Sequence, residues 1–247
     1  MTSVLTTTQA VPRSQRMSSA ASSRLLGTML GVLAVIAVWT GAAQLHRLIP
    51  SPFEAFASVT KSWTAGTLPW QVAWTLSITV QAFFISAAVG ISAGLLIGLS
   101  PTVKAVLGDM VYAASSVPKL MIFPILLVFF GLGRLPETLF VALSGVFLIT
   151  IQVMTGCGDI LVAHRRVGQV FRARKDQVLF KIYLPAIAPS MVAGLRLGFS
   201  MGLVHAVLAE MALGNDGIGY LIWTSYRNLD MGLLFGLVFI VSLFAIE

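Results

Sequence analysis

The chain has 247 residues, of which 57% are hydrophobic and only 10% are charged. A soluble domain has about 25% charged residues, so this chain cannot cover a globule with polar surface, and its main solvent is lipid. The net charge of +7 then reflects the Lys and Arg excess of cytoplasmic loops rather than nucleic-acid binding, and the single cysteine excludes an internal disulfide framework and a multi-cysteine metal site.

The N-terminal part of the chain predicts a tail followed by a membrane helix. Residues 1–24 are rich in Ser and Thr and contain arginines but no acid, which indicates a disordered basic cytoplasmic tail. The uncharged run Leu25–Leu45 exceeds the usual 7–15 residues or so of a signal-peptide core, so we expect a retained transmembrane helix, with a signal peptide over residues 1–45 as the alternative. The more polar segment His46–Trp70 is expected to form an external loop with a short interfacial helix.

The second expected span is Thr75–Leu99, which carries glycines at a spacing of four residues. Residues four apart share one helix face, so a second helix can approach closely along this stripe. The alternative is that glycine is simply common in membrane helices. The stripe consists of Gly90, Gly94 and Gly98.

The third and fourth expected spans are Ala105–Gly133 and Thr138–Cys157. The third is interrupted by Asp109, Lys119 and two prolines, Pro118 and Pro124. Proline bends a helix, and lipid tolerates such a break only where protein or a water-filled cavity covers the freed backbone groups. We therefore expect a broken helix that lines a pathway.

A dense basic segment, His164–Pro189, separates the fourth span from the rest and indicates a cytoplasmic loop over residues 158–189. The fifth expected span, Ser190–Leu213, repeats the four-residue glycine spacing. The sixth run, Met231–Ile246, is short against the roughly 20 residues of a complete span, which suggests that the sequence is incomplete at Glu247. The glycines of the fifth span are Gly194, Gly198 and Gly202.

The distribution of basic residues indicates the orientation. With a cytoplasmic N-terminus, basic residues are more numerous inside than outside, as the positive-inside rule requires, and the number of spans is even, about six. The inner residues are Arg13, Arg16, Arg24, Lys104, Arg165, Arg166, Arg172, Arg174, Lys175 and Lys181, and the outer residues are Arg47, Lys61, Arg134 and Arg227.

Four charged residues lie within apolar runs, where charge is costly and is a candidate for function: Asp109, Lys119, Arg196 and Glu210. Arg196 and Glu210 are about 21 Å apart along a helix and cannot pair, whereas Asp109 is a candidate partner of Arg196 by depth. A structural or interfacial role explains each charge equally well. The sequence contains no His-x-x-x-His, Gly-x-Ser-x-Gly or Walker-type motif, so we expect no catalytic residue, metal or bound cofactor in this chain.

The basic segment ends in Ile182-Tyr183-Leu184-Pro185. It resembles the cytoplasmic loop of permease subunits of binding-protein-dependent ABC importers, whose motif is Glu-Ala-Ala, three residues, Gly, nine residues, Ile-x-Leu-Pro. In this sequence the Glu-Ala-Ala falls on Arg166-Val167-Gly168 and the Gly falls on Arg172, so both positions depart from the pattern.

Further matches lie on either side of the loop and resemble the nitrate, sulfonate and taurine branch of these permeases. The resemblance covers residues 25–247 and implies an all-α membrane protein of type I ABC importer architecture. It also implies a permease dimer, two ATPases that bind ATP and Mg, an external binding protein, and a small anionic solute such as a sulfonate, taurine or nitrate. The matches are Gly194-Leu195-Arg196, Ala209-Glu210-Met211, Gly217-Ile218-Gly219-Tyr220-Leu221-Ile222, and Pro124 with Phe130-Gly131-Leu132-Gly133.

The resemblance further implies that each ATPase contacts a coupling helix in the loop. Pro185 is expected to end this helix and to stiffen the exit toward the fifth span. Arg172 replaces a glycine that would allow a sharp turn, so coupling is altered unless the turn is made elsewhere, for example at Gly168. A solvated basic face is the alternative for the whole loop. The implied coupling residues are Arg172, Arg174, Asp176, Val178, Leu179, Phe180, Ile182, Leu184 and Pro185.

Three other functions are compatible with the sequence. A vitamin or pyrimidine precursor is an alternative solute, and a degenerate permease with impaired coupling is an alternative within the family. An ion-gradient secondary transporter is a different class, which predicts an internal repeat and a coupling acid near the middle of the membrane. Glu210 and Asp109 are instead expected near the ends of their spans, and the sequence shows no convincing repeat.

Overall fold

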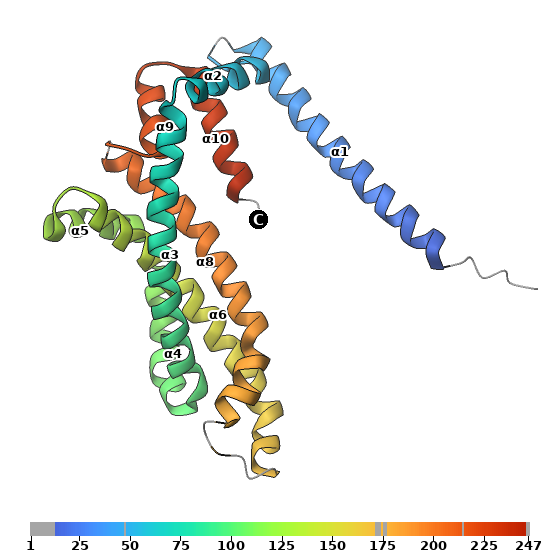
Figure 1. Ribbon diagram of the computed structural model, residues 1–247, viewed down its shortest axis with the longest axis vertical. Coiled ribbons are helices and arrows are strands. Elements are labelled where there is room, and N and C mark those ends of the chain that lie inside the picture. The colour runs from blue at the N-terminus through green and yellow to red at the C-terminus, as the bar shows by residue number, and fades with distance from the viewer. Residues whose placement is uncertain (1–12, 47, 171–173, 175–176, 214, 246–247) are drawn as a thin grey trace, which may run out of the picture. The chain divides into compact units, whose positions relative to one another are not determined.

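The computed structural model describes residues 13–46, 48–170, 174, 177–213 and 215–245. These residues form helices joined by short connections, and they include no strand, which confirms the all-α prediction (Figure 1). The chain divides into two compact units, residues 1–54 and 55–247.

The first unit contains helix α1 (Arg13–Leu45) and the start of α2 (Pro52–Thr64). Within residues 1–24, the structure differs from the predicted tail from residue 13 onward, because the Ala- and Met-containing run before residue 25 continues the helix and contains no proline. Ser51 and Glu54 each accept a hydrogen bond from the other's backbone N–H, at 3.2 and 2.9 Å, which is a capping box. This box fixes the start of α2, which is the short helix predicted in this loop.

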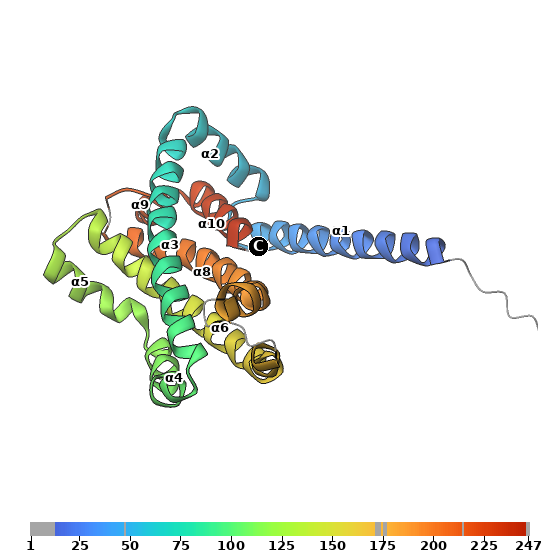
Figure 2. The same cartoon turned by 60° about the horizontal axis from the view of Figure 1, so that its bottom comes forward.

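Three long helices form the centre of the second unit: α3 (Thr67–Leu99), α6 (Arg134–Val170) and α8 (Leu184–Leu213). Helix α6 contacts both of the others, parallel to α3 and antiparallel to α8 (Figures 1 and 2). Ser86 on α3 hydrogen-bonds to the carbonyl of Ala142 at 2.8 Å and fixes the α3–α6 register.

The third apolar run is broken, as the prolines predicted. Helix α4 (Pro101–Ser116) and the segment formed by η1 (Lys119–Ile122) and α5 (Phe123–Phe130) meet at 84°. The backbone between them, at Val117 and Pro118, is extended, because the residue before a proline is disfavoured in the helical region.

The predicted loop over residues 158–189 is largely helical where the structure describes it. Helix α6 continues to Val170, and a π-helical turn, η2 (Val178–Tyr183), runs directly into α8. The prediction that Pro185 ends a helix is therefore wrong, since Pro185 is the second residue of α8. A wider π turn accommodates a proline, whose ring crowds the carbonyl four residues earlier in an α-helix.

Within the part of the chain that the structure describes, three helical segments are long and apolar enough to cross a membrane: Thr67–Leu99, Arg134–Gly158 and Val178–Leu213. The bent α4–α5 pair is a further candidate span. Two shorter apolar helical segments, Met29–Leu45 and Met231–Phe244, coincide with the first and sixth predicted spans. Helix α9 (Ile218–Arg227) connects α8 to α10 (Met231–Ala245).

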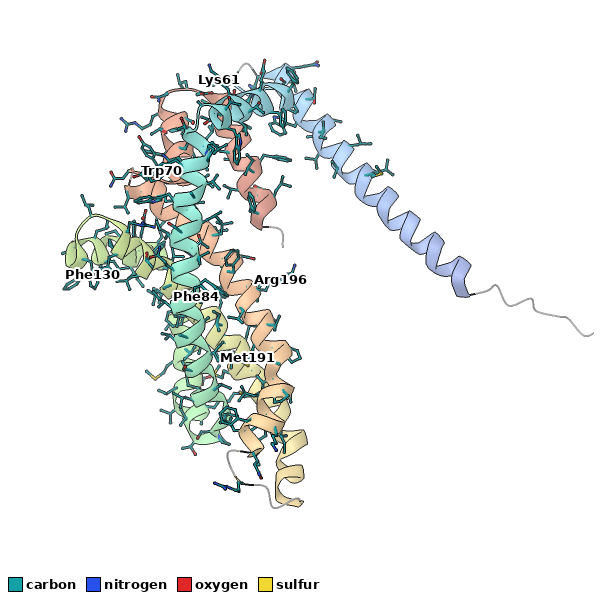
Figure 3. All side chains as sticks on the ribbon, in the orientation of Figure 1. Lys61, Trp70, Phe84, Phe130, Met191 and Arg196 are labelled. Atoms are coloured by element: carbon teal, nitrogen blue, oxygen red, sulfur yellow. The ribbon has the colours of Figure 1, made fainter. Side chains whose placement is uncertain are left out.

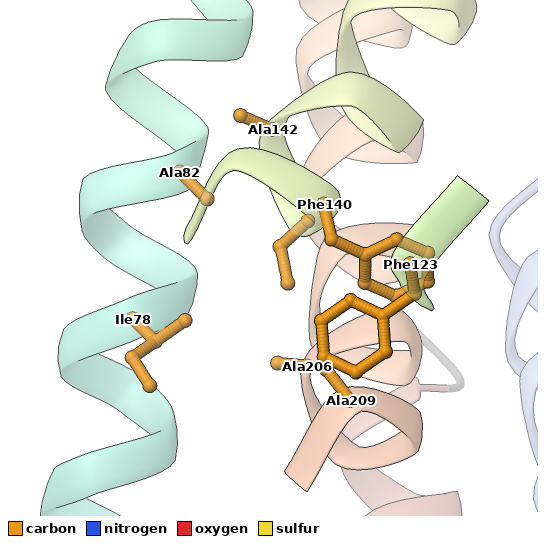
Figure 4. Close-up of a cluster of buried hydrophobic side chains, with 8 residues drawn as sticks. Ile78, Ala82, Phe123, Phe140, Ala142, Ala206 and Ala209 are labelled. Carbon is orange, nitrogen blue, oxygen red and sulfur yellow. The ribbon is translucent and has the colours of Figure 1, made fainter. Parts of the chain in front are cut away.

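A buried cluster connects the bent segment to the long helices (Figure 4). The rings of Phe123, at the start of α5, and Phe140 on α6 lie 4.8 Å apart between centroids. Small side chains from α3 and α8 allow these rings to pack at the helix crossing. The cluster consists of Ile78, Ala82, Phe123, Phe140, Val141, Ala142, Ala206 and Ala209.

Candidate functional site

The glycine stripe of α3 lies directly against α6. A Cβ atom added at Gly90 would lie 2.8 Å from the Cβ atom of Ile149, and one added at Gly94 would lie 2.6 Å from that of Val153. One added at Gly98 would lie 2.7 Å from the Cβ atom of Cys157. These distances are shorter than real Cβ contacts, so the close helix approach requires glycine at all three positions.

The glycines of α8 are also buried and face α6, but the space around them differs from one glycine to the next. A Cβ atom added at Gly198 would lie 2.8 Å from Cδ1 of Ile149, and one at Gly194 would lie 3.0 Å from the Cβ atom of Gln152. At Gly202 the nearest neighbouring atom is 3.6 Å away, an ordinary contact distance. Helix α8 is therefore packed more tightly against α6 at Gly194 and Gly198 than at Gly202.

Glu210 is the buried charged residue at the centre of a polar network. Its side chain is fully buried on α8, and its Oε2 atom accepts hydrogen bonds from Thr75 Oγ1 and from the backbone N–H of Gly219, each at 2.9 Å. Thr75 Oγ1 also accepts from the N–H of Ile218 at 2.9 Å, and Gln71 Oε1 accepts from the N–H of Gly217. Three consecutive backbone N–H groups are thus paired by side chains from α3 and α8.

This network is a helix cap supplied by other helices. The first N–H groups of α9 have no partner within that helix, and unpaired groups are especially costly in a membrane. A carboxylate is also favoured beside a helix N-terminus because of the helix dipole. Gly217 has φ 101°, and a side chain at Gly217 or Gly219 would collide with Glu210 or with the carbonyl of Val207. Glycine at positions 217 and 219 therefore leaves the space that the side chain of Glu210 occupies.

Other polar residues surround this cap. Trp70 Nε1 donates to Asp216 Oδ1 at 3.3 Å, and Glu137 is buried in the first turn of α6. Sequence reasoning singled out Glu210 and the glycines but missed Gln71 and Thr75. Their signal is polar residues four apart at the start of an otherwise apolar helix, on one helix face.

The remaining intramembrane charges occupy different places. Lys119 Nζ donates to the carbonyl of Ser115 at 2.6 Å and lies 5.6 Å from the centroid of the Phe147 ring. It therefore pairs a carbonyl group in the last turn of α4, at the break. Asp109 on α4 and Arg196 on α8 are both exposed and form no ion pair with each other. Figure 3 labels Arg196 on α8. The expected Asp109–Arg196 pairing is therefore not present.

The predicted coupling residues lie around η2. Arg172 and Asp176 are outside the described residues, and Arg174 is exposed. Leu179 lines a small apolar hollow with residues at the end of α3, whereas Phe180 points outward, with 66% of its surface exposed. The other members are half-buried Val178, Ile182 and Leu184, and exposed Pro185.

Long apolar helices packed through glycine faces, with buried polar groups paired at a helix cap, define a polytopic integral membrane protein. Among the described residues no group of three His, Cys, Asp or Glu side chains is arranged to hold a metal ion. The family model described as the binding-protein-dependent transport system inner membrane component matches residues 86–246. The chain belongs to this family of ABC importer permeases.

Several relatives are similar to this chain at modest sequence identity. The chain is 25% identical over 233 residues to the taurine transport system permease protein TauC of Escherichia coli, covering 90% of this chain and 85% of the relative. It is 30% identical over 186 residues to the nitrate import permease protein NrtB of a Synechocystis species, covering 75% and 66%. It is 32% identical over 161 residues to the bicarbonate transport system permease protein CmpB of Synechococcus elongatus, covering 64% and 58%.

Solved structures show the same fold. An inward-facing structure of the MetNI methionine ABC transporter contains a chain that matches with a TM-score of 0.58 and 19% identity, covering 69% of this chain and 86% of that chain. At this identity the match shows the fold alone. It confirms the predicted type I importer permease architecture.

Proposed function

We propose that this permease moves a small anionic solute, of the aliphatic sulfonate, taurine or nitrate type, across the bacterial cytoplasmic membrane. The observation that carries the proposal is that the relatives covering most of the chain are named for taurine and nitrate, and a shorter match is named for bicarbonate. These solutes share a compact oxyanion group, although they differ in everything attached to it. We infer that the oxyanion is the feature common to the solutes of this branch.

The energy for transport comes from ATP, bound with Mg on a separate ATPase chain, and an external binding protein delivers the solute to a permease dimer. In this arrangement the N-terminus is cytoplasmic and the η2 turn faces the ATPase. The support is geometric: Phe180 presents a large apolar surface outward, while Leu179 on the same turn packs toward the end of α3. A residue that anchors the turn and a residue free to dock are what a coupling element needs.

The direct test reconstitutes the chain with an ATPase and a binding protein of this family and measures ATP-dependent uptake of taurine, ethanesulfonate, nitrate and bicarbonate. Uptake of at least one of these anions, with no uptake of an uncharged solute of similar size, is the expected result. Uptake that follows an ion gradient without ATP would show an ion-coupled secondary transporter instead, and uptake of only a vitamin or pyrimidine precursor would contradict the solute class.

Coupling is tested separately by association with the ATPase. Phe180→Asp and Arg174→Glu should each weaken co-purification of the ATPase and reduce uptake, because they place negative charge on the proposed docking surface. Arg227→Glu, in the last turn of α9, is the matched control. Normal association with little uptake in the unaltered protein would favour a permease with impaired coupling, as the departures at Arg166 and Arg172 allow.

A further inference from the structure

A groove lies between α3 and α6. It has a volume of about 610 Å³ and is open to one side. One end carries polar groups, and the other is apolar, with Phe84 projecting from α3 (Figure 3). Its lining residues are Gln81, Phe84 and Ile85 of α3 and Arg134, Leu135 and Thr138 of α6.

The guanidinium group of Arg134 is held in place at the polar end. It donates a hydrogen bond to Ser77 Oγ, and its Cζ atom lies 4.4 Å from the centroid of the Trp74 ring. Ser77 Oγ lies in turn 2.7 Å from the carbonyl of Trp74, so hydroxyl, ring and guanidinium form one cluster. A cation fixed against a ring needs less ordering when it binds a ligand than a freely rotating one.

The positive charge of Arg134 is not neutralised by an ion pair within the described part of the chain. Glu137, three residues further along α6, interacts electrostatically with Arg134, but its carboxylate is buried. A guanidinium has five N–H donors in a planar fork, and one interaction with Ser77 leaves most of them available. This fork matches two oxygen atoms of a sulfonate, phosphate or carboxylate group.

The apolar end lies further along the same two helices. On α3, Phe84 lies two helical turns beyond Ser77, about 10 Å along the axis. Between these levels lie Gln81, whose Nε2 atom donates to the carbonyl of Ser77 at 2.9 Å, and Thr138, which carries a hydroxyl group. The groove therefore changes from cationic through polar to apolar over the length of a short-chain organic anion.

We propose that this groove binds an oxyanion group at Arg134, with the apolar part of the ligand along Phe84, Ile85 and Leu135. The inference rests on the proposed transport of small anions and names one place where such an anion is held. The same chemistry has two sources, a free sulfonate in transit and the phosphate of an anionic lipid headgroup. Both present oxygens to the guanidinium fork and carbon to the apolar wall.

Protection of a groove cysteine tests the proposal directly. Leu135→Cys is made with Cys157→Ala in the full chain, in phosphatidylcholine nanodiscs, and modified with a small methanethiosulfonate reagent. Added ethanesulfonate should slow the modification several-fold and saturably, because a ligand held by the guanidinium fork covers the neighbouring residue 135. Arg134→Gln should abolish this protection and Arg134→Lys should leave part of it. Arg227→Gln, an exposed arginine outside the groove, should leave it unchanged.

The two sources are separated by the membrane composition. If phosphatidylglycerol in the nanodisc slows modification in an Arg134-dependent way and ethanesulfonate does not, the groove binds a lipid headgroup. If neither compound protects the cysteine in an Arg134-dependent way, the proposal is overturned. Should Arg134→Gln not fold, the difference between Arg134→Lys and the unaltered protein decides the same question.

Parallel uptake measurements keep this inference separate from the proposed function. Uptake of anions without Arg134-dependent protection would overturn the groove as a binding site and leave the transport function standing. Protection by ethanesulfonate without uptake of any tested anion would contradict the transport function and leave oxyanion binding standing.

Discussion

Replacing Glu210 tests whether the buried network acts as a cap for α9. Glu210→Ala removes the acceptor of the buried Gly219 N–H, whereas the hydroxyl of Thr75 can turn to the carbonyl of Gln71, 3.2 Å away. An orphaned buried donor costs about 1–3 kcal/mol, and the space left by the side chain adds about 1–2 kcal/mol. The sum, about 2–5 kcal/mol, corresponds to a melting temperature lower by about 5–15 °C in a chain of this size.

Glu210→Gln is the matched substitution. A glutamine keeps an oxygen acceptor for Gly219 and Thr75, and its amide nitrogen takes the place of Oε1, which has no hydrogen-bond partner among the described residues. We expect a loss of about 1 kcal/mol, clearly smaller than for alanine. Asp109→Ala, which removes an exposed acid on α4, should change stability by less than about 0.5 kcal/mol.

The single cysteine supplies the assay. Cys157 is free and fully buried between α3 and α6, so a thiol-reactive fluorophore reports its exposure when the helices separate on heating. The expected order of melting temperatures is unaltered protein and Asp109→Ala, then Glu210→Gln, then Glu210→Ala. Equal losses for glutamine and alanine would refute the capping role, because the acceptor oxygen would then contribute nothing.

Three further predictions concern helix packing and the π turn. Gly94→Ala should lower the free energy of unfolding by about 1–3 kcal/mol through overpacking, whereas Gly202→Ala, with room for a methyl group, should leave it unchanged; equal effects would contradict the difference in fit. Gly217→Ala should destabilise the protein by more than about 1 kcal/mol, because of its positive φ and its contact with the carboxyl group, and the cysteine assay measures this. Pro185→Ala should let the π turn relax to an α turn and rotate Phe180 by about 100°, lowering ATPase association; unchanged association would argue against a fixed docking face.

The positions of the helices follow from the sequence more closely than the contacts between them. The break at Pro118 and the close approach at Gly90 and Gly94 follow from local chemistry, since proline excludes helix and glycine presents no side chain. The cap on Glu210 did not follow, because it brings together Gln71 and residues that are more than 140 positions away in sequence. Depth along a helix predicts which residues share a level but not which faces meet, which is why the expected Asp109–Arg196 pair is absent.

The η2 turn runs directly into α8, so one continuous helical segment joins the residues around Phe180 to the cap at Glu210. Val178–Leu213 is one helical segment of 36 residues, about 54 Å long, with Phe180 near one end and Glu210 near the other. A force applied at Phe180 would move α8 as a rigid unit. Because α8 approaches α6 closely at Gly194 and Gly198, we expect the two helices to move together rather than to slide past one another. The hydrogen bonds of Glu210 to Thr75 and Gly219 would then carry the movement to α3 and α9. The bent junction at Val117 and Pro118 has an extended backbone instead, so movement between helices is expected there rather than within the packed group.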